Sequence, residues 1–389
     1  MAATALGRRI RLGMIGGGGA ALIGPVHRMA ARLDDRFEIV AGVLSSNQDR
    51  ALAEAERLGI PRGYRTVQAM LEAEAGRADG IDAVAIMTPN DSHAAFANMA
   101  LDAGLDVICD KPLTNDLDSS LALATKARER GLVLSLTHNY SGYPMVREAR
   151  ASVLAGELGP IRVAHVAYVQ GSLGSLVESH PADMPSRLKW RLDPAVGGQS
   201  HVLGDIGTHA HQLLTYVTGQ RVTSVLADVG AAVPGRTADD TASVIVRMAD
   251  GARGVLLATK AATGAENAMA LEVYGEAGGV FWQQSSANEL RVMRRDGPAE
   301  IRTRGLQTLH PLSLRGTRLA PGHPEAFIEG FANIYVDFAD LVAARRAGVA
   351  PDPLALHGPD AMTGVDGLAF IEACLASSRD GGWADLRQI

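Results

Sequence analysis

The chain has 389 residues, of which 47% are hydrophobic and 21% are charged, and its formal net charge is −6. This composition is that of an ordinary globular protein and excludes a disordered chain. The acidic balance argues against a nucleic-acid-binding protein, which normally carries a basic surplus, and no apolar run is long enough to span a bilayer. A chain of this length is expected to form two domains.

The first third of the chain alternates between short apolar runs and amphipathic stretches. After a first strand that begins at residue 10, the pattern predicts strands at residues 37–43, 81–87, 105–109 and 132–136, and helices at residues 48–58, 92–103 and 117–130. Continuous apolar strands separated by helices predict a parallel sheet covered on both faces. Ligands of such sheets bind outside the carboxyl ends of the strands.

The pattern changes after about residue 140. Short strands are predicted at residues 161–170, 222–229, 242–248, 254–259, 269–274, 280–284 and 289–293, followed by two long helices at residues 325–346 and 358–378. Consecutive strands joined by turns favour a mainly antiparallel sheet. The segment 172–198 is rich in Pro, Gly and Ser, and we expect a long ordered loop beside the active site.

A glycine-rich turn follows the first strand, in the sequence IRLGMIGGGGAALIG of residues 10–24. Gly16, Gly18 and Ala21 fit the dinucleotide-binding pattern G-x-G-x-x-G/A. Such a turn lets the backbone approach a pyrophosphate, and the helix that follows presents free amide donors. Glycine clusters also form plain turns, so the motif alone leaves both interpretations open.

Polar loops follow the other strands of the predicted parallel sheet. Because the carboxyl ends of parallel strands meet at one edge, we expect these loops to gather beside the glycine turn. They are Ser45-Ser46, Thr88-Pro89-Asn90, Asp110-Lys111-Pro112 and His138-Asn139-Tyr140.

Lys111 stands at that edge, near the place where a nicotinamide would lie. An oxidised nicotinamide is cationic, so a partly desolvated ammonium beside it could exchange protons near neutrality. The alternative is a solvated lysine at a strand end.

Asp205 and His209 are four residues apart at the start of a predicted helix, hence on one face and able to interact. A carboxylate can fix the tautomer of an imidazole and raise its basicity, which makes His209 a candidate general base. The alternative is that Asp205 caps the helix and His209 lies on the surface. His201 and His211 are close in sequence, but His209 and His211 point to different helix faces, so no metal site is expected.

Trp190, Arg191 and Asp193 precede that helix. An indole offers a flat apolar surface, and Arg and Asp offer directed hydrogen bonds, which together suit a sugar ring. A structural loop anchored by a buried tryptophan and an ion pair would use the same residues.

Two further features bear on the cellular compartment. Cys109 and Cys374 lie in apolar runs and indicate buried, reduced thiols. Arg8-Arg9 before an apolar stretch has the look of a twin-arginine export signal. Glycines interrupt that stretch, and it also fits the first strand, so a cytoplasmic protein is expected.

Together, the glycine turn, Asp110-Lys111-Pro112 and Asp205-x-Gly-x-His209 resemble the glucose–fructose oxidoreductase/inositol dehydrogenase (Gfo/Idh/MocA) family. The resemblance implies an α/β fold with an N-terminal Rossmann domain, residues 1–138. A C-terminal α/β domain, residues 139–389, would be built on a mostly antiparallel open sheet that serves assembly into a homodimer or homotetramer. The run Trp190-Arg191-Leu192-Asp193-Pro194 is similar to the branch that contains levoglucosan dehydrogenase.

The resemblance also implies a function. The family's catalytic lysine, aspartate and histidine match Lys111, Asp205 and His209. The expected reaction is NAD(P)-dependent oxidation of a secondary alcohol of a sugar, anhydrosugar or cyclitol, with hydride transfer to nicotinamide. The alternatives are an enzyme that retains its cofactor and oxidises a sugar transiently for elimination or glycosidic cleavage, and a non-catalytic sensor.

Residue by residue, the expected cofactor contacts are Gly16, Gly18, Gly19, Ala21, Ser45, Ser46, Arg50, Thr88, Pro89, Asn90, His93, Asp110 and Lys111. The expected substrate contacts are Lys111, Asn139, Tyr140, Trp190, Arg191, Asp193, Asp205 and His209.

Two positions depart from the family pattern. Asp110 replaces the usual Glu and keeps its charge. At the end of the second strand, residues 44–47 include no acidic side chain to hold the adenosine ribose, which is the usual mark of NAD preference. Ser46 and Arg50 could instead accept a 2′-phosphate, so the cofactor is NAD or NADP. NAD is favoured because a catabolic oxidation would use it.

Overall fold

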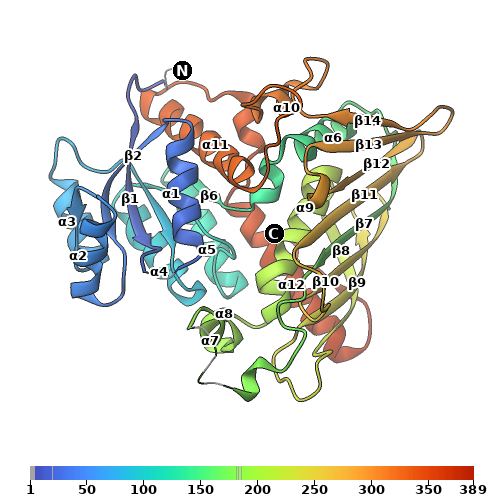
Figure 1. Cartoon of the computed structure of the whole chain (residues 1–389), viewed down its shortest axis with the longest axis horizontal. Helices are drawn as coiled ribbons and strands as arrows, with labels where there is room; N and C mark the ends of the chain where they lie inside the picture. Colours follow the sequence, from blue (N-terminus) through green and yellow to red (C-terminus); the bar gives the residue numbers. More distant parts are fainter. Residues whose placement is uncertain (1–4, 20, 181, 183, 185) are drawn as a thin grey trace. The chain divides into compact units, whose positions relative to one another are not determined.

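The computed structural model describes residues 5–19, 21–180, 182, 184 and 186–389 (Figure 1). The chain forms two compact units. The first takes Met1–Gly142 and Phe327–Val365, and the second takes Tyr143–Ala326 and Asp366–Ile389. The expected boundary after residue 138 therefore lies close to the first crossing. Residues 327–365, which were expected to belong to the C-terminal domain, cluster with the first unit.

A six-stranded parallel sheet forms the centre of the first unit. Its strands run in the order β3-β2-β1-β4-β5-β6, and every neighbouring pair is parallel. All residues of β4 are buried, as expected of a central strand covered on both faces. The bounds are β1 (Ile10–Gly16), β2 (Phe37–Val43), β3 (Arg62–Gly63), β4 (Ala83–Met87), β5 (Asp106–Cys109) and β6 (Leu134–Leu136). The predicted parallel sheet is confirmed.

The helices between these strands begin where short polar side chains can cap them. Asn47, Thr66 and Asp116 each accept a hydrogen bond from a backbone amide in the first turn of α2, α3 and α5. The helical bounds are α1 (Ile23–Leu33), α2 (Gln48–Arg57), α3 (Val67–Ala75), η1 (Asn90–Ser92), α4 (His93–Asp102), α5 (Leu117–Glu129) and η2 (Asn139–Gly142).

Helix α11 (Phe327–Ala347), followed by η6 (Pro353–His357), completes the first unit. Its buried aromatic side chains pack on β2, where the ring centroids of Phe37 and Tyr335 lie 5.4 Å apart and those of Phe37 and Phe338 lie 6.1 Å apart. His27 of α1 joins the same cluster and is hydrogen-bonded through Nδ1 to the Tyr335 hydroxyl at 2.8 Å. A parallel sheet needs cover on both faces, and α11 supplies part of it.

A nine-stranded sheet forms the second unit, in the order β14-β13-β12-β11-β7-β10-β9-β8-β15. Among the described strands of this sheet, β7 and β10 form the single parallel pair and the other pairs are antiparallel. The bounds are β7 (Ile161–Val169), β8 (Val222–Gly230), β9 (Thr241–Met248), β10 (Arg253–Thr259), β11 (Ala268–Gly275), β12 (Gly278–Gln283), β13 (Glu289–Arg294), β14 (Glu300–Thr303) and β15 (Ala384–Asp385). The predicted mostly antiparallel sheet is confirmed.

Helices cover one face of this sheet (Figure 1). Helix α9 packs on β7, β10 and β11, and α6 packs on α9. On the opposite face Ile245 and Val255, neighbours in register, are 46% and 45% exposed. The remaining helical bounds are α6 (Pro144–Leu154), η3 (Val177–Ser179), α7 (Ser186–Leu192), α8 (Pro194–Gly197), η4 (Leu203–Gly207), α9 (Thr208–Thr218), η5 (Gln284–Ser286), α10 (Pro311–Arg315) and α12 (Ala361–Asp380).

Segment 172–198 is more regular than expected. It contains η3, α7 and α8 rather than a loop throughout, and Asp193 caps α8 by accepting a hydrogen bond from Ala195 N at 3.0 Å. Both cysteines are buried and unpaired, as the sequence indicated. Within the described part of the chain, no helix has the length and apolar character needed to cross a bilayer.

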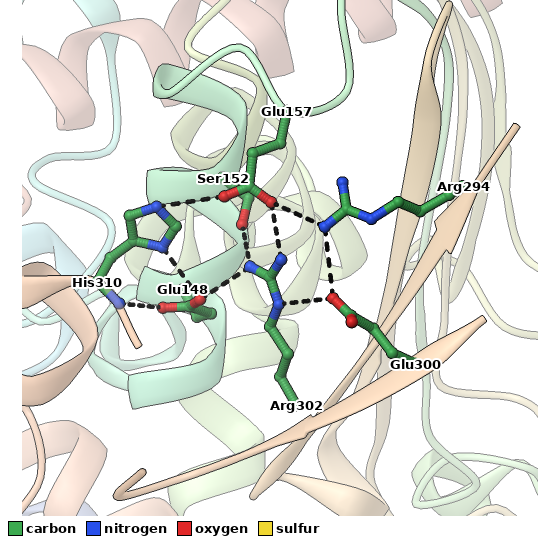
Figure 2. A network of polar contacts seen from close by, with 7 residues as sticks. All are labelled: Glu148, Ser152, Glu157, Arg294, Glu300, Arg302 and His310. Carbon is green, nitrogen blue, oxygen red and sulfur yellow. Dashed lines mark hydrogen bonds and ion pairs between the residues drawn. The ribbon is translucent and has the colours of Figure 1, made fainter. Parts of the chain in front are cut away.

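A polar network fastens α6 to the edge of the sheet in the second unit (Figure 2). Arg302 of β14 donates to Glu148 Oε1 at 3.0 Å, to Ser152 Oγ at 2.9 Å and to Glu157 Oε2 at 2.8 Å. The backbone amide of His310 donates to Glu148 Oε2 at 2.9 Å. The Glu148 side chain is only 1% exposed, so these donors replace the water that would otherwise solvate its carboxylate.

Replacing Glu148 by Ala is expected to lower the free energy of unfolding by about 3 kcal/mol, because Arg302 and His310 would lose a buried carboxylate. Glu300, 48% exposed on the other side of the same arginine, provides the control. Glu300→Ala should cost less than about 1 kcal/mol. Urea unfolding followed by tryptophan fluorescence measures both, since all three tryptophans lie in the second unit. Equal losses would contradict the argument from burial.

Candidate active site

The glycine turn after β1 is shaped by contacts that leave no room for side chains. Gly16 and Gly17 have φ angles of +86° and +74°, which favour glycine. A Cβ atom on Gly16 would lie 2.7 Å from the Met87 carbonyl oxygen, and one on Gly18 would lie 2.3 Å from the Leu44 carbonyl oxygen. The turn therefore lies against the carboxyl ends of β4 and β2. This is the edge, and the reversal of strand order between β1 and β4, where such sheets bind ligands.

The third small position of the motif is Gly24 rather than Ala21. Helix α1 begins at Ile23, and a Cβ atom on Gly24 would lie 1.9 Å from the Gly17 carbonyl oxygen. The close packing of helix on turn, which the last glycine of the fingerprint provides, therefore falls three residues later than expected. The available signal was a further glycine, Gly24, at the start of the amphipathic stretch that forms α1.

The turn suits an anionic group. The backbone amide of Gly19 donates to Glu54 Oε2 at 2.9 Å, so a carboxylate already occupies one of its donors. Arg57 first, and this amide second, lower the pKa of Glu54. Leu22, the N-cap residue of α1, makes no side-chain hydrogen bond to the first turn. First-turn amides at this helix end, together with glycines that leave no room for side chains, fit the pyrophosphate of a dinucleotide.

His93 joins two of the predicted loops. Its Nδ1 lies 2.8 Å from the Pro112 carbonyl oxygen and its Nε2 lies 2.9 Å from the Thr88 carbonyl oxygen, and the residue is fully buried. The side chain therefore holds Thr88 and Pro112 in place rather than offering a nitrogen to a cofactor. Thr88, Pro89 and Asn90 lie at the end of β4, as expected.

Asp110 organises the turn that carries Lys111. Its Oδ1 accepts hydrogen bonds from Thr137 Oγ1 at 2.7 Å and from the Lys111 backbone amide at 3.0 Å. Burial alone would raise the pKa of Asp110, but His27, Lys111 and the Thr137 hydroxyl outweigh it and lower that pKa. The Lys111–Pro112 peptide bond is cis. Asp110 is thus a charged anchor for the backbone of Lys111.

The end of β2 forms the predicted ribose-binding segment. Ser45 Oγ accepts from the Asn47 amide at 3.1 Å, and Asn47 Oδ1 accepts from the Arg50 amide at 2.9 Å. The side chains of Ser46 and Arg50 are exposed. This leaves a hydroxyl and a guanidinium, and no carboxylate, in residues 44–47 and 50.

Asp205 and His209 occupy a junction of two helix types in the second unit. Asp205 lies in the π-helical turn η4 and His209 in the first turn of α9, so the regular helix expected across both is wrong. Single π turns often mark functional sites. His209 is 8% exposed, and its ring packs edge-on to Tyr168 with centroids 6.0 Å apart.

The Asp205 carboxylate faces two cations. Its Oδ2 accepts a hydrogen bond from the ammonium of Lys260, and its Oδ1 lies 3.8 Å from Arg191 Nε. Lys260 was not predicted as a site residue, because it lies 55 positions away in the sequence. The available signal was its place directly after the strand predicted at residues 254–259.

The remaining predicted substrate residues have varied surroundings. The Arg191 guanidinium lies over the Trp190 ring, 4.5 Å from its centroid. Asp193 is engaged as a helix cap, as described above. In the first unit, Asn139 and Tyr140 are only 3% and 1% exposed. Among the described residues, no group of three or more His, Cys, Asp or Glu could hold a metal ion.

Comparisons with known proteins agree with this architecture. The profile of an oxidoreductase family with an NAD-binding Rossmann fold matches residues 10–138, and the GFO/IDH/MocA C-terminal domain matches residues 146–281. The uncharacterized oxidoreductase YfiI of Bacillus subtilis is 30% identical over 98% of both chains. Levoglucosan dehydrogenase of Pseudarthrobacter phenanthrenivorans is 27% identical over 82% of both chains.

Solved structures extend the similarity to the whole fold. An inositol dehydrogenase homolog from Azotobacter vinelandii, in complex with NAD⁺, superposes with a TM-score of 0.91 at 32% identity, covering 98% of this chain and 99% of that one. The chain therefore belongs to the Gfo/Idh/MocA family. It is an oxidoreductase with an NAD-binding Rossmann domain.

Gly24→Ala is expected to weaken dinucleotide binding about tenfold or more, because relieving the clash with Gly17 must move α1 or the turn at a cost of about 1–3 kcal/mol. Gly76→Ala is the matched control, since its φ is −85° and a Cβ atom there meets nothing within 4 Å. Calorimetric titration with NAD and NADP measures both variants. Unchanged affinity in Gly24→Ala would refute the packing role of this glycine.

Proposed function

We propose that the protein is an NAD-dependent dehydrogenase that oxidises a secondary alcohol of a sugar, anhydrosugar or cyclitol. The proposal rests on three residues of this chain that match the catalytic lysine, aspartate and histidine of the family. Lys111 follows β5 on a turn anchored by charged Asp110, and Asp205 and His209 stand at the η4–α9 junction. Relatives are named levoglucosan dehydrogenase and myo-inositol dehydrogenase, and a homologous structure contains NADH and myo-inositol.

The first unit supplies the residues that would hold the dinucleotide. Gly16, Gly18, Gly19 and the N-terminus of α1 would bind the pyrophosphate, Ser45, Ser46 and Arg50 the adenosine ribose, and Thr88, Pro89 and Asn90 the nicotinamide ribose. When bound, the cofactor supplies the acceptor for the hydride of the carbinol carbon. Substrate contacts are assigned to Trp190 and Arg191, and also to Asn139 and Tyr140 once a ligand is present.

Side chains of the protein accept the proton of the substrate hydroxyl and stabilise the resulting alkoxide. His209 removes the hydroxyl proton through Nε2, because Nδ1 is buried. Asp205 orients and polarises the imidazole, and the Lys111 ammonium donates a hydrogen bond to the developing alkoxide. A preorganised donor at such an oxygen typically lowers the activation free energy by about 3 kcal/mol.

Assembly and location complete the proposal. The uncovered face of the large sheet, with Ile245 and Val255 about half exposed, supports a homodimer or homotetramer formed through it. Arg8 forms a two-pronged ion pair with buried Asp82 at 2.6 and 3.0 Å, so one arginine of the export-like pair serves the fold. This supports a cytoplasmic enzyme.

Lys111→Ala and His209→Ala are each expected to lower kcat on the order of 100-fold or more, because each removes a group that moves or stabilises a proton. Dinucleotide binding should persist. The assay follows NADH absorbance over a panel of monosaccharides, inositols and anhydrosugars. The control is Lys126→Ala, since Lys126 is a partly exposed surface partner of Asp102. Near-wild-type turnover in both variants would overturn the assignment. Sugar consumption without NADH accumulation would favour a cofactor-retaining enzyme, and binding without turnover a sensor.

Cofactor choice yields a separate prediction. The wild-type enzyme should use NAD with a kcat/KM about tenfold or more above that for NADP, since exposed Arg50 alone gives weak phosphate recognition. Arg50→Ala should lower kcat/KM for NADP further and leave the value for NAD unchanged. Steady-state kinetics with both cofactors measure this. A preference for NADP that Arg50→Ala abolishes would show that Ser46 and Arg50 bind a 2′-phosphate.

A further inference from the structure

Lys260 stands immediately after β10, with its backbone fixed on both sides. Its amide donates to the Asp240 carbonyl oxygen at 2.8 Å, and its carbonyl oxygen accepts from the Leu173 amide at 2.9 Å. The residue is 6% exposed. A lysine buried this far, on a backbone held this firmly, has little freedom to place its ammonium elsewhere.

The ammonium of Lys260 forms an ion pair with Asp205 and donates a hydrogen bond to its Oδ2. The side chain of Lys260 is 7% exposed and that of Asp205 is 23% exposed. Arg191, at 3.8 Å from Oδ1, approaches the other oxygen from α7. Lys260 is thus the closer and more buried of the two cations, and the stronger influence on the carboxylate.

Other ionisable groups lie near this pair, among them Asp239, whose Oδ1 accepts a hydrogen bond from the Val202 amide at 2.6 Å. His201, just before η4, interacts with Lys260, Asp205 and Arg191, and burial first and Lys260 second lower its pKa to about 4. It is therefore neutral near pH 7. Glu178 faces His201 from η3. His209, four residues after Asp205, carries Tyr168 against its ring.

We propose that Lys260 is a positioning residue of the reaction: its ammonium holds the Asp205 carboxylate charged and in one orientation, and thereby sets the basicity of His209. The inference rests on the proposed function, because it assigns Lys260 a part in the work of Asp205 and His209. A carboxylate beside an imidazole favours the protonated ring, and a cation on that carboxylate reduces the effect. Lys260 therefore keeps His209 available as a base at neutral pH.

The test compares Lys260→Met and Lys260→Gln, which remove the charge, with Lys260→Arg, which keeps it. Without the charge, His209 holds its proton more tightly. The acidic limb of the kcat/KM profile should therefore move up by about one pH unit, and kcat at pH 7 should fall about tenfold. Lys260→Arg should keep the wild-type limb. Lys260→Gln retains a hydrogen-bond donor and carries the test if Lys260→Met does not fold. Lys126→Met is the control for loss of a lysine charge elsewhere.

A second readout is independent of catalysis. Histidine-labelled protein is titrated by NMR, and the His209 signal, one of 11, is assigned by its loss in His209→Gln. A rise of about one unit in the His209 titration midpoint in both charge-removing variants supports the inference. It does so even if no sugar is turned over and the proposed function fails. If activity falls but neither the acidic limb of the kcat/KM profile nor the His209 titration midpoint moves, Lys260 is only a structural ion-pair partner and the inference is wrong. Unchanged kinetics with an unchanged His209 midpoint would also overturn the inference.

Discussion

The whole first unit depends on one constraint: a purely parallel sheet has two apolar faces, and neither tolerates water. The helices that follow β1 to β5 in sequence do not complete the cover, so α11 returns after nearly two hundred residues to pack Tyr335 and Phe338 on Phe37. With the sheet covered, its strands all point one way. Their carboxyl ends then bring the glycine turn, Thr88, Asp110 and Lys111 to a common edge, where backbone contacts with the turn leave no space for side chains.

Much of this arrangement was visible in the sequence, because local patterns generated it. The strands and helices that the sequence predicted lie within a few residues of their expected ends, since apolar runs, capping residues and glycines act over short distances. Shorter or less periodic elements, such as α3, α6, β3 and β14, were not expected. A second kind of omission is non-local. Nothing in residues 327–347 shows that their aromatic side chains belong with Phe37 rather than with the neighbouring strands. In segment 172–198 the high content of Pro, Gly and Ser obscured two short helices, because Asp193 and Pro194 start a helix as readily as they form a loop.

The candidate site shows the same difference between features with a local sequence pattern and features without one. Lys111, Asp205 and His209 follow from short motifs, and the loops of the first unit gather where strand polarity predicts. Errors arose where geometry departs from a regular template. A longer turn moved the packing glycine to Gly24, and a π turn replaced the helix that was to carry Asp205. The partner of Asp205 was out of reach, because an ion pair across 55 residues has no periodic signature and lysines at strand ends are common on protein surfaces.

The first unit is built from two separate parts of the chain, and this affects the order in which the protein folds during synthesis. The chain passes between units after Gly142, again before Phe327 and a third time within α12. A ribosome thus releases the nucleotide-binding sheet long before the helix that shields it, and the hydrophobic surface awaiting Phe331, Tyr335 and Phe338 stays uncovered during the interval. In the second unit, by contrast, strands β7 to β14 are all synthesised before α11. The strands made first are therefore covered by a helix that is made only after most of the second unit's sheet.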